Sequence, residues 1–92
     1  MRIYQIDDNP NTLWFTNYEH KEENELFAEI LDVIQKNPEI SVGEKMTGPS
    51  EDYYECVIHG EKFSLIFDLD YGPSIFADDR KVIKKLKSFF VE

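Results

Sequence analysis

The sequence predicts an α+β fold, in which an antiparallel β-sheet of about four to five strands carries two helices packed on one face. Short runs of alternating apolar and polar residues recur along the chain between turn-forming residues, which is typical of strands. Two segments, residues 20–36 and 80–91, repeat apolar residues at helical spacing. No linker or repeat divides the 92 residues, so we expect one acidic domain over residues 1–92.

A β-hairpin is expected at the N-terminus. Residues 2–6 (RIYQI) alternate as a strand does, and residues 7–11 (DDNPN) have the composition of a turn. Residues 12–18 (TLWFTNY) then form the second strand. The apolar triplet LWF in this strand cannot place all three side chains on one sheet face, because successive side chains point to opposite faces. At least one of its aromatic residues is therefore exposed or buried by another element.

The helix over residues 20–36 is the clearest element of the sequence. Its apolar residues share one face, and Asn37-Pro38 supplies the stop. Four acids fall at positions i, i+3, i+7 and i+10 and line the other side of the helix. We name these four residues the acidic stripe: Glu22, Glu25, Glu29 and Asp32.

Three strands are expected after this helix, over residues 39–46, 53–58 and 62–69. Residues 47–52 (TGPSED) form a loop between the first two. A tight hairpin turn joins the last two, with Gly60-Glu61 at its first two positions.

The chain is expected to close with a turn, a short strand and a helix. Residues 70–73 form the turn, and residues 74–77 form the strand. Asp78 or Asp79 is the expected N-cap of the helix over residues 80–91. The apolar face of this helix comprises Val82, Ile83, Leu86, Phe89 and Phe90.

Charge argues against several classes of partner. The net charge is −9, and it is unevenly distributed: residues 1–61 carry 14 acids and 4 bases, whereas residues 80–92 carry 1 acid and 5 bases. An acidic body repels phosphates and anionic lipid headgroups and attracts basic proteins. We therefore expect a basic protein partner, with no nucleic acid and no membrane.

The compartment is predicted to be the cytoplasm. Cys56 is the only cysteine, which fits a reducing environment. The N-terminal residues contain two aspartates where a signal peptide would be apolar, and no apolar run approaches the length of a membrane span.

The stretch FDLDYGPSIFADD, residues 67–79, is the one place where acids suggest a metal site. Asp68 and Asp70 could direct two carboxylates to the same side of a strand end. The remaining ligands of a calcium loop are missing, and a turn followed by a helix cap explains the same aspartates. No metal ligand, cofactor or catalytic residue is predicted: Cys56 falls in a strand as a buried thiol, and His20 and His59 lack ligand spacing.

The residues expected on the surface indicate protein binding more strongly than any residues indicate a metal or catalytic site. Trp14, Tyr53 and Tyr71 adjoin turns, and tryptophan and tyrosine are the residues that most often anchor interfaces. The loop sequence GPSEDYYE mixes acids with aromatic residues. The candidate partner-binding residues are accordingly Trp14 and the segment formed by Glu51, Asp52, Tyr53, Tyr54 and Glu55, together with the acidic stripe.

In its small size, acidity, α+β pattern and mixture of acids with aromatic residues, the chain resembles bacterial immunity proteins of the colicin and contact-dependent inhibition type. The segment FSLIFDLDYGPSIFADD is similar to small bacterial domains, some of them immunity-like, but it transfers no functional residue. The resemblance implies an antitoxin-like protein that binds a cognate toxin, most simply a basic nuclease domain, and occludes its surface.

Two alternatives remain at this stage. The chain could be a non-catalytic adaptor or regulatory subunit that binds another basic protein. It could instead be a small metal-dependent enzyme, in which case a divalent ion would raise its melting temperature through Asp68 or Asp70.

Overall fold

The structure, a computed structural model, describes residues 2–6, 8–16, 22–68 and 72–90. It is an α+β fold with two helices and an antiparallel sheet of six strands, so the expected class is confirmed and the expected count of four to five strands is too low. None of the helices in the described ranges is long and apolar enough to cross a membrane. In chain order, the elements are β1 (Arg2–Ile6), β2 (Asn9–Thr16), α1 (Glu23–Lys36), β3 (Ile40–Thr47), β4 (Glu51–Ile58), β5 (Glu61–Asp68), β6 (Gly72–Phe76) and α2 (Arg80–Lys87).

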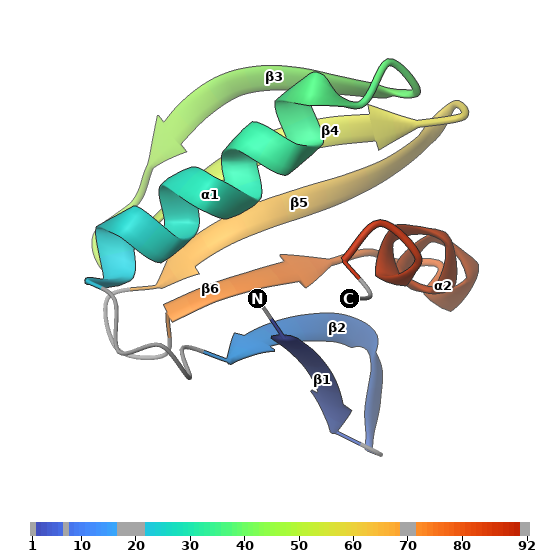
Figure 1. Cartoon of the computed structure of the whole chain (residues 1–92), viewed down its shortest axis with the longest axis horizontal. Coiled ribbons are helices and arrows are strands. Elements are labelled where there is room, and N and C mark those ends of the chain that lie inside the picture. The colour runs from blue at the N-terminus through green and yellow to red at the C-terminus, as the bar shows by residue number, and fades with distance from the viewer. Residues whose placement is uncertain (1, 7, 17–21, 69–71, 91–92) are drawn as a thin grey trace.

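The short strand β6 joins the N-terminal hairpin and a three-stranded meander into one sheet. The strand order is β1-β2-β6-β5-β4-β3, so β6 lies between the N-terminal hairpin and the β3–β4–β5 meander (Figure 1). The Asn11 amide strengthens this junction, because it donates to the carbonyls of Ala77 and Asp78, each at 2.8 Å. β2 begins at Asn9, three residues before the expected strand, and its pairing with β6 covers Thr12 to Trp14.

The turn between β4 and β5 differs from the expected one by a single residue. Ile58 pairs with Glu61, so His59 and Gly60 form a two-residue loop, with φ values of 49° and 79°. Positive φ at both central positions is the geometry that matches the twist of a hairpin. The assignment to Gly60-Glu61 was wrong because a histidine at positive φ is uncommon in general.

Both helices pack against the same face of the sheet. The register aligns Leu13, Ile75, Leu65 and Tyr54 across four strands on this face. From α1, Phe27 stacks on Tyr54, with ring centroids 6.1 Å apart. Beyond α2, the Phe90 ring contacts the Phe15 ring edge-on, with ring centroids 5.0 Å apart. The buried residues of both helices belong to one hydrophobic core: Leu26, Ile30 and Ile34 from α1, and Val82, Ile83 and Leu86 from α2.

The closing helix is shorter than expected. α2 ends at Lys87, and Phe89 and Phe90 follow it in a turn. Asp79 is the N-cap, and its carboxylate accepts a hydrogen bond from the backbone N–H of Lys81 at 2.9 Å. Of the two capping residues considered, the structure therefore uses Asp79.

Candidate partner-binding surface

The acidic and aromatic segment of β4 divides between the two faces of the sheet. Tyr54 and Asp52 point to the helix-covered face, where Tyr54 packs beneath Phe27 and Asp52 lies 3.6 Å from the Lys45 ammonium. Glu51, Tyr53 and Glu55 point to the opposite face, because side chains alternate along a strand. We call this opposite surface the open face.

One row of residues crosses the open face from edge to edge. The pairing register connects six successive neighbours, one from each strand: Tyr4, Trp14, Ser74, Ile66, Tyr53 and Met46. We call these six residues the cross-sheet row. Five of the six are large apolar or aromatic residues, so the row joins Trp14 and Tyr53, which lie far apart in the sequence.

The open face carries large exposed apolar residues and is covered by neither helix. Both helices lie on the other side of the sheet, and the exposed large hydrophobic residues of the described chain all lie here: Tyr4 is 47% exposed, Met46 43% and Phe76 39%. Phe76 pairs with Thr12 and Ser64, which places it beside the cross-sheet row. Apolar residues gathered on one face, rather than scattered singly, mark an interaction site.

Trp14 has a polar atom that its surroundings do not satisfy. The side chain is half-buried, and among the described residues its indole N–H is buried without a hydrogen-bond partner. An unpaired buried donor costs about 1–3 kcal/mol.

Carboxylates flank the cross-sheet row. Glu51 and Asp68 are cross-strand neighbours on one side of it, and Glu55 lies on the other side, where it accepts a hydrogen bond from the Ser64 hydroxyl at 3.4 Å. Glu55 and Asp78 also line a hollow of about 210 Å³ beside Phe76, together with Lys62. The open face therefore combines an apolar centre with acids around it.

The acidic stripe lies on a different surface. Glu22, Glu25, Glu29 and Asp32 are all exposed along the outer side of α1, which packs on the helix-covered face of the sheet. Asp32 forms an ion pair with Lys36 at 2.9 Å. The two candidate surfaces from the sequence are thus on opposite sides of the molecule, and one flat partner cannot contact both.

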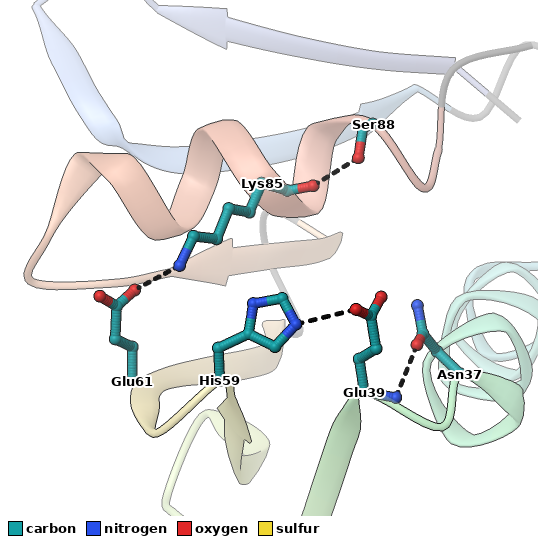
Figure 2. Close-up of polar contacts among 6 residues, drawn as sticks. All are labelled: Asn37, Glu39, His59, Glu61, Lys85 and Ser88. Atoms are coloured by element: carbon teal, nitrogen blue, oxygen red, sulfur yellow. Dashed lines mark hydrogen bonds and ion pairs between the residues drawn. The ribbon is translucent and has the colours of Figure 1, made fainter.

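The remaining sequence candidates have structural roles or lie outside the description. Asp70, Tyr71 and His20 are outside the described residues. His59 bonds Glu39 at 2.9 Å, which connects the β4–β5 turn to the segment between α1 and β3. Glu61 bonds Lys85 at 3.2 Å, which connects the same turn to α2 (Figure 2). Within the described ranges, no three His, Cys, Asp or Glu side chains are grouped as metal ligands would be.

Cys56 is held as a neutral thiol. It is 1% exposed, and burial raises the pKa of its thiol to about 11. Since the thiolate is the reactive form, we expect Cys56 in the folded protein to react with a thiol reagent roughly tenfold or more slowly than in the urea-unfolded chain. At pH 9, which lies above the ordinary thiol pKa of about 8.5 but well below the pKa of Cys56 in the folded protein, the folded protein should still be labelled much more slowly than the unfolded chain. Equal rates in the two states would show that Cys56 is accessible.

Sequence reasoning missed most of the cross-sheet row. Tyr4, Ser74, Ile66 and Met46 carry no motif, and neither does Phe76 beside the row. The available signal is that strands such as KFSLIFD place apolar residues at both odd and even positions, which indicates that both sheet faces carry apolar side chains.

Comparison of the chain with protein-family models, with curated proteins and with solved structures finds no match.

Proposed function

We propose that this protein is a non-catalytic binding module that docks a basic protein partner on its open face. In its most specific form, the proposal is that the chain acts as an immunity protein and neutralises a toxin domain, most simply a basic nuclease, by covering its nucleic-acid site. The observation that carries the proposal is the cross-sheet row, a largely apolar strip that neither helix covers and that has carboxylates on both sides.

The chemistry of the open face matches that of a protein interface. Interfaces concentrate binding energy in a few desolvated aromatic side chains near their centre, surrounded by a polar rim. Trp14 and Tyr53 would form such a centre, and Glu51 and Glu55 would form part of the rim. Tyrosine and tryptophan suit this role because each combines a large apolar body with a polar end.

The negative charge of the protein favours a basic partner. The chain carries a net charge of −9, and the acids beside the cross-sheet row add a local negative field. A nuclease presents basic side chains to bind phosphates, so an acidic protein is drawn to the same surface and associates quickly.

The acidic stripe is the weaker candidate for this role. It offers exposed carboxylates, but the large exposed apolar residues of the described chain lie on the open face instead. Charge without an apolar centre steers association and adds little affinity.

Kinetics of association with the toxin domain test the proposal. On this hypothesis, the gene next to that of the chain encodes a protein with a basic C-terminal domain, which serves as the partner in the assay. The double variant Glu51→Gln, Glu55→Gln should reduce the association rate constant roughly fivefold at low salt and flatten its salt dependence, because rim charges act mainly on encounter. Stopped-flow fluorescence measures both effects.

The matched control removes two charges from the acidic stripe. Glu22→Gln, Glu25→Gln changes the net charge by the same amount, so its effect should be clearly smaller if position matters. A larger effect from the stripe variant would move the interface to α1, and no association of the wild-type protein would refute neutralisation of this partner.

A further inference from the structure

A basic pocket lies where α2 meets the N-terminal hairpin. Its volume is about 390 Å³, and its walls are formed by Gln5 and Pro10 from the hairpin and by four cationic residues of α2: Arg80, Lys81, Lys84 and Lys87. Gln5 and Pro10 are held together by a hydrogen bond from the Gln5 amide to the Pro10 carbonyl at 3.2 Å. None of these residues belongs to the cross-sheet row.

The four cations of the basic pocket have no acidic partner in the described ranges. Lys85, on another side of α2, shows the contrast, because its ammonium bonds the Glu61 carboxylate at 3.2 Å (Figure 2). The pocket cations instead lie near one another, since residues three and four apart are neighbours on a helix. In a chain with a net charge of −9, half of all lysine and arginine residues fall within residues 80–87.

This arrangement lowers the stability of α2. Arg80 and Lys81 lie in the first turn, where the helix dipole disfavours positive charge. The first turn contains no acid, and the N-cap carboxylate of Asp79 offsets part of this cost. Like charges at positions such as Arg80 and Lys84 cost a further few tenths of a kcal/mol per pair. Lys84 and Lys87, near the other end, gain from the dipole. Burial of the apolar residues of α2 does not require cations at the first two positions, so their concentration needs another explanation.

We infer that the basic pocket binds a small anion that carries two or more negative charges, of the phosphate and pyrophosphate class. Arginine recognises phosphate oxygens through its planar pair of donors, and lysines add point charges from several directions. The volume of the pocket lies within the range of small-molecule sites. A small anion fits better than a nucleic acid or an anionic membrane, because either of these would bring further negative charge against the acidic body.

Titration with inorganic pyrophosphate tests this inference. The amide resonances of the ¹⁵N-labelled protein are followed at constant ionic strength, with chloride replaced by pyrophosphate. We expect saturable shifts confined to Gln5 and residues 80–87. Lys84→Gln should weaken binding roughly tenfold, because it removes a charge-assisted hydrogen bond to the anion.

Lys36→Gln is the matched control, since Lys36 is an exposed lysine on the other helix. It should leave the affinity unchanged. The inference is overturned if the shifts do not saturate, if they spread equally to Lys36 and Lys45, or if Lys84→Gln binds as the wild type does. Lys84-dependent binding to phosphatidylglycerol vesicles without binding of pyrophosphate would overturn it in favour of a membrane contact. Because the basic pocket and the open face share no residue, none of these results bears on the proposed partner.

Discussion

Replacement of Leu65 by alanine is expected to lower the free energy of unfolding by about 3 kcal/mol. Leu65 is fully buried and lies between Ile75 and Tyr54 in the row that both helices cover. Its truncation removes apolar contacts and leaves a cavity in a domain whose total stability is roughly 5–15 kcal/mol. Urea unfolding followed by circular dichroism measures the loss as a lower midpoint with an unchanged slope.

The neighbouring residue Ile66 provides the control. Its side chain points to the open face, so Ile66→Ala should cost no more than about 1 kcal/mol, as is usual for a side chain outside the core. Equal losses for Leu65→Ala and Ile66→Ala would mean that the open face is covered in the free protein, which would contradict its assignment as a docking surface.

Replacement of Tyr53 by alanine is expected to weaken binding of the basic partner by about 2 kcal/mol or more, which is roughly 30-fold in the dissociation constant. Tyr53 lies within the cross-sheet row, between Ile66 and Met46, and has carboxylates two residues away on each side. A desolvated tyrosine at an interface centre contributes both apolar area and a hydrogen bond. Isothermal titration calorimetry at fixed salt measures the change.

Tyr54 serves as the comparison for Tyr53, because the two are adjacent in sequence and lie on opposite faces. Tyr54→Ala removes the ring that stacks on Phe27, so it should lower stability while leaving the affinity of the folded fraction near that of the wild type. If Tyr53→Ala binds as tightly as the wild-type protein, the centre of the interface lies elsewhere.

Local patterns predicted the elements well where side-chain periodicity was strong. The helical spacing of Leu26, Ile30 and Ile34 corresponds to the buried side of α1, and the alternation of Phe63 and Leu65 corresponds to the buried side of β5. In both elements, the apolar residues that pack into the core are the ones whose regular spacing predicted the helix or the strand.

Element ends were less predictable because they depend on contacts distant in sequence. β2 starts early at Asn9, close to Asn11, whose amide binds carbonyls beyond the end of β6. Phe90 continues the apolar pattern of α2 but packs on Phe15 from a turn rather than from the helix. Neither contact is visible from local sequence.

The open face could be predicted only in part. Trp14 and Tyr53 were identified by residue type, but their membership of one row depends on β6 pairing with both β2 and β5. Strand order and register bring Ser74 and Ile66 between them, and neither is encoded in a local motif. The alternation along β4 likewise separates Tyr53 from Tyr54, which the sequence had grouped as one segment.

Site-specific photo-crosslinking tests the central claim most directly, because it identifies the surface that contacts the partner. A photoreactive phenylalanine analogue replaces Phe76 on the open face in one variant, Phe76→p-benzoylphenylalanine. In the other variant, it replaces Glu25 on the acidic stripe, Glu25→p-benzoylphenylalanine. Irradiation with the basic C-terminal domain encoded by the neighbouring gene should join that domain to the first variant and not to the second. Crosslinking through position 25 alone, or through neither position, would contradict the assignment of the open face as the docking surface.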